Sequence, residues 1–95
     1  MTHKIDFKTY FKTYSNSYGV YVTPKEFKII SDNLIKLGFK NNFKKSNPTC
    51  IWIDPENKIF ECYGFKEGQL TCQILITPKE LNSYLNKLIK EDSDN

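Results

Sequence analysis

The 95-residue chain contains no arginine and no alanine, so lysine supplies all of its side-chain positive charge apart from one histidine. Arginine grips phosphate, carboxylate and guanine edges with a planar fork of two hydrogen bonds, whereas lysine acts as a point charge. Sequence-specific reading of DNA is therefore disfavoured. The heavy use of Lys, Asn, Ile, Phe and Tyr is typical of AT-rich coding sequences, such as those of low-GC bacteria, their phages and other mobile elements.

The usual signatures of catalysis and of metal binding are also missing. His3 is the only histidine, and the four glycines are too scattered to form a phosphate-binding loop. The three cysteines, Cys50, Cys62 and Cys72, include no Cys-x-x-Cys pair, and their odd number argues against a disulfide framework. We therefore expect no enzyme activity, no cofactor and no metal site.

Long apolar runs are absent too. No stretch approaches the roughly 20 apolar residues that span a bilayer, and the segment 1–6 lacks the apolar core of a signal peptide. These observations predict a cytoplasmic protein without a membrane segment. The length predicts one domain over residues 1–95, with a polar, frayed tail at 91–95.

The most informative feature that is present is the tetrapeptide Thr-Pro-Lys-Glu, which occurs at Thr23–Glu26 and again at Thr77–Glu80. A capping Thr, a Pro at the first helical position and a Glu three residues after the cap are typical of a helix start. Each copy follows a β-branched run and precedes apolar residues at helical spacing. Two strand-to-helix transitions are therefore predicted.

These starts and the hydrophobic periodicity predict an α+β fold in the order α-β-α-β-β-β-α. An aromatic stripe with helical spacing places a short helix at 6–15. The expected helices are 6–15, 24–37 and 78–91, and the expected strands are 18–22, 49–54, 58–63 and 69–76. The last three strands should form an antiparallel meander, which strand 18–22 can join, while residues 40–48 read as a basic loop.

The turn sequence at 54–57 suggests that Asp54 pairs with Lys58, and that Glu61 then faces Gln73 on the next strand. On this register, one sheet face should meet the helices. It carries Cys50, Trp52, Phe60, Cys62, Leu70, Cys72, Ile74 and Ile76. The opposite face carries Ile51, Ile53, Ile59, Glu61, Tyr63, Thr71, Gln73 and Leu75. The N-terminal helix either covers this second face or leaves an exposed apolar surface for binding.

The candidate partner-binding residues lie on this second face, in the basic loop and in the acidic turn. They are Phe43, Lys44, Lys45, Asp54, Glu56, Glu61, Tyr63 and Gln73. Phe43 can be read in two ways: as an exposed anchor for a partner, or as a core residue that fixes the loop. The carboxylates Asp54, Glu56 and Glu61 are too unspecific to indicate a paired-carboxylate active site.

Three functional hypotheses remain. The first is a small non-catalytic module that inhibits or neutralises another protein by steric blockade, in the manner of immunity proteins, antitoxins and phage inhibitors; its partner would be a toxin, a nuclease or a host factor. The second is single-stranded nucleic-acid binding through Lys and sheet aromatics. The third is an assembly subunit that pairs through a sheet edge at 18–22 or 70–76. We expect a monomer or a weak homodimer.

The two halves of the chain differ in net charge, and each half favours a different class of partner. Residues 1–48 carry nine lysines against three acids, a net +6, whereas residues 49–95 carry five lysines against eight acids, a net −3. An acidic second half suits the basic active site of a nuclease, whereas a basic first half suits phosphate.

Overall fold

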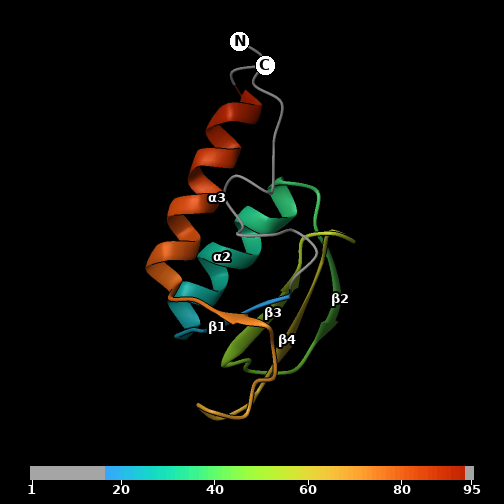
Figure 1. Ribbon diagram of the computed structural model, residues 1–95, viewed down its shortest axis with the longest axis vertical. Helices are drawn as coiled ribbons and strands as arrows, with labels where there is room; N and C mark the ends of the chain where they lie inside the picture. The colour runs from blue at the N-terminus through green and yellow to red at the C-terminus, as the bar shows by residue number, and fades with distance from the viewer. Residues whose placement is uncertain (1–16, 94–95) are drawn as a thin grey trace.

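The computed structural model describes residues 17–93, with side chains up to residue 90 (Figure 1). Five strands form one sheet in the order β2-β4-β3-β1-β5, and two helices lie together on one of its faces. The elements are β1 (Tyr18–Tyr21), α2 (Pro24–Lys36), β2 (Lys40–Lys44), β3 (Cys50–Asp54), β4 (Ile59–Tyr63), β5 (Ile74–Leu75) and α3 (Pro78–Ser93). The α+β class is as predicted, but the sheet is mixed. The helix expected at 6–15 lies outside the described residues.

Both Thr-Pro-Lys-Glu copies begin a helix, but they use the glutamate differently. At α2 the capping box is complete: Thr23 Oγ1 accepts from the Glu26 N–H at 3.2 Å, and the Glu26 carboxylate accepts from the Thr23 N–H at 2.9 Å. At α3, Thr77 Oγ1 accepts from the Glu80 N–H at 3.1 Å. The Glu80 carboxylate accepts instead from Tyr84 Oη, one turn further along the helix, at 2.9 Å.

The core lies between the two helices and the sheet face that they cover. Gly38 ends α2 with a φ of +90°, a conformation that suits glycine, and the chain then turns so that Phe39 is buried. The buried side chains of this core cluster come from both helices and from the sheet. They are Tyr18, Val20, Ile30, Leu34, Leu37, Phe39, Ile51, Ile53, Phe60, Cys62, Ile76, Leu81, Leu85 and Leu88.

The β3–β4 hairpin is present, but its predicted register is wrong by one residue. Asp54 pairs with Ile59 instead of Lys58, because Lys58 takes a φ of +54° and extends the turn. A one-residue slip moves the side chains of one strand to the opposite face relative to its neighbour. Ile51 and Ile53 therefore share the buried face with Phe60 and Cys62. Cys50 and Trp52, which were expected in the core row, lie on the other face.

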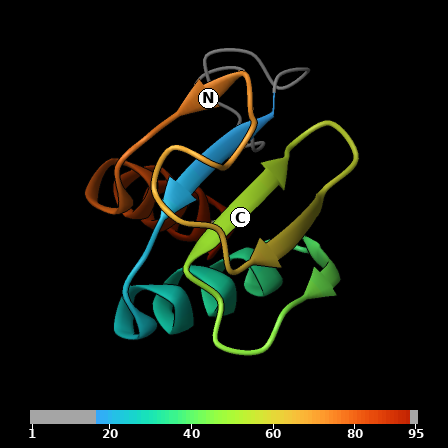
Figure 2. The same ribbon diagram turned by 90° about the horizontal axis from the view of Figure 1, so that it is seen from below.

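The predicted third strand of the meander is also wrong. Only Ile74–Leu75 is a strand, and it runs parallel to β1 instead of antiparallel to β4. The Ile74 N–H donates to Ser17 O at 3.0 Å, and the Ile76 N–H donates to Gly19 O at 2.9 Å. The segment 64–73 consequently leaves β4 and crosses the sheet to reach the far side of β1 (Figure 2). Residues 18–21 are therefore a central strand of this sheet and offer no edge.

The segment expected as a loop contains an additional strand. Lys40–Lys44 forms β2, which runs parallel to β4, with an irregularity between Asn41 and Phe43. All five residues of β2 are exposed, because it is the terminal strand at its end of the sheet. The remaining residues of the predicted loop, 45–49, connect β2 to β3.

Candidate functional site

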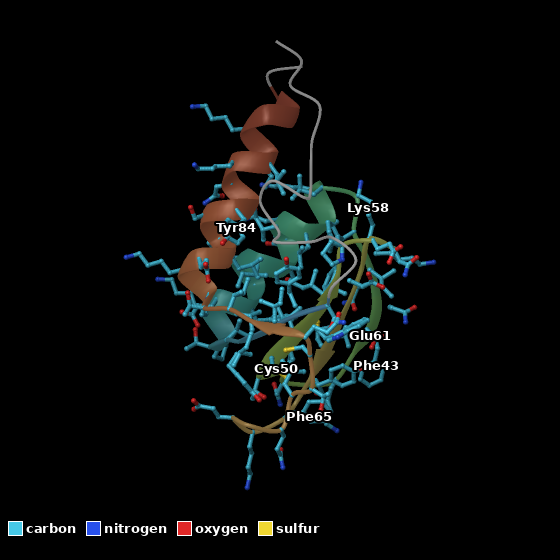
Figure 3. All side chains as sticks on the ribbon, in the orientation of Figure 1. Phe43, Cys50, Lys58, Glu61, Phe65 and Tyr84 are labelled. Carbon is cyan, nitrogen blue, oxygen red and sulfur yellow. The ribbon has the colours of Figure 1, made fainter. Side chains whose placement is uncertain are left out.

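The sheet face opposite the helices carries polar and aromatic side chains around Glu61. Trp52 lies directly across from Glu61 on β3, and Phe43 lies across from it on β2. Tyr63 is two residues further along β4 and therefore points to the same face. Glu61 thus has aromatic neighbours on both adjacent strands and along its own strand. Figure 3 shows Phe43, Glu61 and Phe65 gathered away from the helical side, where Tyr84 lies.

Three of the aromatic rings on this face form a stacked row, which we call the aromatic ridge (Phe43, Tyr63 and Phe65). The centroids of Phe43 and Tyr63 are 5.2 Å apart, and those of Tyr63 and Phe65 are 4.8 Å apart. The second pair is nearly parallel, at 10°. Phe43 is 47% exposed and Phe65 is 37% exposed, so both ends of the ridge are open to solvent. Exposed, clustered aromatic residues are typical of binding surfaces.

The Glu61 carboxylate is fixed by hydrogen bonds from two neutral donors. Asn42 Nδ2 donates to Oε2 at 2.6 Å, and Tyr63 Oη donates to Oε1. The hydrogen bond to Glu61 is the main reason that the pKa of Tyr63 is raised to about 12, with burial and the charge of Glu61 adding to it. The phenol is therefore a proton donor that holds the carboxylate in place.

Beside the ridge is a depression of about 320 Å³, which we call the Trp52 hollow. Strands β3 and β4 form its floor, and the crossing segment 64–73 forms its wall. Its lining combines three aromatic rings with a carboxylate and other polar groups. The lining residues are Trp52, Glu61, Tyr63, Phe65, Gln69, Leu70 and Thr71.

The wall of the hollow is held mainly by the hydroxyl of Tyr21 on β1. Tyr21 Oη accepts from the N–H groups of Gly68 and Leu70, both at 2.9 Å, and donates to Lys66 O at 3.1 Å. Thr49 Oγ1 adds a bond of 2.6 Å to Phe65 O. These four bonds fix the backbone of residues 65–70, so the hollow is a preformed feature of the fold.

Gly19 allows the crossing segment to approach the sheet closely. A Cβ atom at this position would lie 2.5 Å from Cys72 Sγ and 2.7 Å from Leu70 Cδ2. Any side chain at residue 19 would therefore push the segment away from β1. The hollow depends on this absence of a side chain.

Of the predicted site residues, Phe43, Glu61 and Tyr63 come together on this face. Lys44 and Lys45 follow Phe43 but point elsewhere. Lys44 Nζ lies 5.3 Å from the ring centre of Phe27 on α2, and the aliphatic chain of Lys45 runs past Gly64.

The other three predicted residues lie apart from the ridge. Asp54 accepts from the N–H groups of Glu56 and Asn57 and from the Asn57 side chain, which makes it the organiser of the hairpin turn. Glu56 is exposed in the same turn. Gln73 Oε1 accepts from the Ser17 N–H at 2.7 Å, so Gln73 ties β5 to β1 and does not face Glu61.

A second depression, of about 640 Å³, lies between the start of α2 and the β2–β3 connection. Its lining is largely apolar, with Lys44 at its side. The lining residues are Val22, Pro24, Phe27, Lys44, Ser46, Asn47, Pro48 and Thr49. No charged group of this lining is paired with a carboxylate in the part of the chain described.

The cysteines do not form the row that the predicted register implied. Cys50 and Cys62 project to opposite faces of the hairpin, and Cys72 lies in the crossing segment. Burial raises the pKa of the Cys62 thiol to about 11, opposed in part by Lys44. Within residues 17–93, no group of three or more His, Cys, Asp or Glu side chains is placed to hold a metal ion.

Sequence reasoning missed six residues of this site: Asn42, Trp52, Phe65, Gln69, Leu70 and Thr71. The sequence pattern predicts a core position for Trp52 only with a turn that is one residue shorter than the observed turn. Phe65 and Leu70 belong to a segment whose course depends on Tyr21 and Gly19. The signal available in the sequence is the alternation Ile51, Trp52, Ile53. If the two isoleucines face the core, Trp52 must lie on the opposite face of the sheet.

The chain matches no protein-family profile, no curated protein sequence and no solved structure. Neither of the two described helices has the length and apolar character that crossing a membrane requires.

Proposed function

We propose that this protein is a non-catalytic binding module, and that the aromatic ridge and the Trp52 hollow form its contact surface for another protein. The observation that supports this proposal is the exposed, stacked row of Phe43, Tyr63 and Phe65 beside a preformed hollow. Aromatic residues in the centre of a surface patch, surrounded by polar groups, are typical of protein interfaces.

The mode of action that we propose is steric blockade of the partner, as in immunity proteins, antitoxins and phage inhibitors. A standard interface buries about 800 Å² on each side. We expect the sheet face opposite α2 and α3, together with the crossing segment, to supply this area. A toxin, a nuclease or a host factor is the class of partner that this mode implies.

Single-stranded nucleic acid is the weaker alternative for the same face. Bases stack on open ring faces, but Tyr63 has Phe43 on one side and Phe65 on the other. Glu61 places a carboxylate at the centre of the surface, where it would repel phosphate. Lys44 points toward α2, so it does not flank the ridge with positive charge. These three features favour protein over nucleic acid as the ligand.

The experiment that tests the proposal is affinity capture from the native host, with and without nuclease treatment, using the wild-type chain and two matched variants. One variant is Phe43→Ser combined with Phe65→Ser, which removes both open ends of the ridge. The control is Ile29→Ser combined with Ile35→Ser, which removes two exposed apolar side chains from α2. Circular dichroism establishes that both variants are folded.

The expected result is one stoichiometric protein that survives nuclease, is lost by the ridge variant and is retained by the α2 control. Equal retention by both variants would show that the ridge is not the contact surface. Recovery that depends on nucleic acid, together with a steep loss of affinity in added salt, would identify the alternative function.

A further inference from the structure

We infer that the Trp52 hollow is a receptor for a guanidinium group, and that the partner protein inserts an arginine side chain into it. This inference rests on the proposed protein-binding function and specifies its chemistry. It follows from three observations: the aromatic lining, the fixed carboxylate of Glu61, which has no ion-pair partner among residues 17–90, and the size of the hollow.

The aromatic lining supplies the first part of the recognition. Trp52 and Phe65 line the hollow together with Tyr63, whose ring is stacked between Phe43 and Phe65. The electron-rich faces of aromatic rings attract cations, so Trp52 and the outer face of Phe65 are the rings that can bind one. Trp is the strongest of the aromatic side chains in such contacts, and a guanidinium is the cation most often found on a ring. Its flat shape also allows it to stack on Trp52.

The Glu61 carboxylate supplies the second part. Each of its oxygens accepts one hydrogen bond, from Asn42 or from Tyr63, and a carboxylate has about four acceptor sites. One further site therefore remains on each oxygen, which is the arrangement that a two-pronged guanidinium fork requires. Because both existing donors are neutral, the negative charge of Glu61 is not compensated by them.

The described part of the chain leaves this charge available. Among the described residues, the ion pair that forms is Lys28 with Asp32, and no lysine approaches Glu61 within ion-pair distance. The sequence contains no arginine, so no guanidinium of its own can occupy the hollow. A matching guanidinium must therefore come from another molecule.

The dimensions limit the occupant. At about 320 Å³, the hollow is at the lower end of the roughly 300–1,000 Å³ that is usual for ligand pockets. It suits one side chain presented by a protein surface. The wall held by Tyr21 and Thr49 means that little ordering of the chain is required when that side chain enters.

The test uses Trp52 as an intrinsic probe, because it is the single tryptophan of the chain. The full-length protein is titrated with N-acetyl-argininamide, and in parallel with the capped lysine compound and the capped citrulline compound, at constant ionic strength. Citrulline keeps the shape of arginine without its charge. We expect saturable changes in Trp52 fluorescence with arginine, at a dissociation constant on the order of millimolar. Lysine should bind more weakly, and citrulline should give no saturation in that range.

Two charge-removing variants give the residue-level test. Glu61→Gln keeps the shape of the side chain but replaces one acceptor oxygen with an NH2 donor, so one of the bonds from Asn42 and Tyr63 is lost together with the charge. It should weaken arginine binding on the order of tenfold, mainly because the charge is lost. Glu56→Gln removes the same charge from the exposed hairpin turn, and should change the binding by less than about twofold. Circular dichroism checks that both variants fold.

The inference is overturned if citrulline binds as well as arginine, if lysine binds as tightly as arginine, or if Glu56→Gln weakens binding as much as Glu61→Gln does. If Glu61→Gln fails to fold, the inference is tested instead by NMR chemical-shift changes of the wild-type protein on addition of the capped arginine. Arginine-induced shifts centred on the Trp52 indole N–H support the hollow, whereas shifts spread over the exposed acids overturn it.

The partner captured from the native host allows this inference to be tested separately from the proposed function. If the ridge variant loses the partner but Glu61→Gln retains it at unchanged affinity, the protein-binding function stands and the arginine receptor is wrong. If the ridge variant retains the partner, the proposed function fails whatever the capped arginine does.

Discussion

Tyr63 donates its hydroxyl hydrogen to the carboxylate of Glu61, two residues earlier on the same strand and on the same face. This bond favours the protonated phenol and is the main cause that raises the pKa of Tyr63 from 10.0 to about 12. Glu61→Gln should therefore return the pKa of Tyr63 toward 10, as measured by the ultraviolet absorbance of tyrosinate. Tyr63→Phe identifies the titration step that belongs to this residue. An unchanged step in Glu61→Gln would contradict the assignment.

The same bond gives a stability prediction with a definite sign. Because the pKa in the folded state is above that in the unfolded state, the stabilising contribution is complete below about pH 10 and is lost as the pH rises toward 12. Wild type should thus lose more stability than Tyr63→Phe between pH 10 and pH 12, as followed by denaturant unfolding at each pH. Parallel losses in the two proteins would show that the bond is absent in solution.

The hairpin register can be tested with two isoleucines. Ile53 is fully buried under the helices, whereas Ile59 is half-buried on the opposite side of the sheet from the core. Ile53→Ala should reduce the free energy of unfolding by about 2–5 kcal/mol because it leaves a cavity, and Ile59→Ala should cost clearly less. Urea denaturation of both variants gives the comparison. Similar, small losses in both variants would favour the register in which Asp54 pairs with Lys58, because that register places both isoleucines on the sheet face away from the helices.

Gly19→Ala should disturb the wall of the Trp52 hollow. Its new Cβ would lie 2.5 Å from Cys72 Sγ and 2.7 Å from Leu70 Cδ2, closer than such atoms can approach. We expect a loss of about 1–3 kcal/mol in unfolding free energy and a changed Trp52 emission spectrum. Gly64→Ala is the matched control, since its nearest neighbour, Lys45 Cε, is 3.6 Å away, and it should stay within about 0.5 kcal/mol of wild type.

The capping box at α2 predicts how much stability is lost when the side-chain oxygen of Thr23 is removed. Thr23→Ala should destabilise the protein by about 1 kcal/mol, because the Glu26 N–H loses its acceptor, whereas Thr23→Ser should keep most of that energy. The midpoint of urea unfolding measures both. Equal stability of Thr23→Ala and wild type would show that solvent replaces the cap without loss.

The thiols should be protected in the native protein. Cys50 and Cys62 are buried, and burial raises the pKa of Cys62 to about 11 and also raises the pKa of Cys72. The thiolate is the reactive form, so reaction with an aromatic disulfide reagent at neutral pH should be slow, with the half-buried Cys72 reacting first. Cys72→Ser should remove that first phase. Rapid modification of all three thiols before unfolding would contradict the described burial.

The sequence predicted those elements whose signals are local. The two Thr-Pro-Lys-Glu starts and the glycine after the first helix depend only on neighbouring residues, and each marks a helix boundary in the structure. Strand 18–22 and the two strands of the hairpin were also recognisable from β-branched and aromatic residues. The α+β class followed from these elements.

What the sequence did not predict depends on distant contacts. The exposed residues of β2, Lys-Asn-Asn-Phe-Lys, have no strand pattern, and they become a strand by pairing with β4. The position of β5 beside β1 depends on Tyr21 and Ser17, which form hydrogen bonds with Leu70 and Gln73, about 50 residues further along the chain. For the site, Phe43, Glu61 and Tyr63 were identified from composition and alternation, but Trp52 required the length of the turn, which depends on the backbone angle of Lys58.

The position of β1 between β3 and β5 has a consequence for synthesis on the ribosome. Residues 18–21 pair with residues 50–53 on one side and with residues 74–75 on the other. This interior strand is thus made early but acquires its second neighbour only after about 50 further residues have emerged, and α3 follows later still. Until then the apolar faces of α2 and the hairpin lack their cover, so a nascent chain stalled before residue 74 should be a chaperone substrate or a protease target.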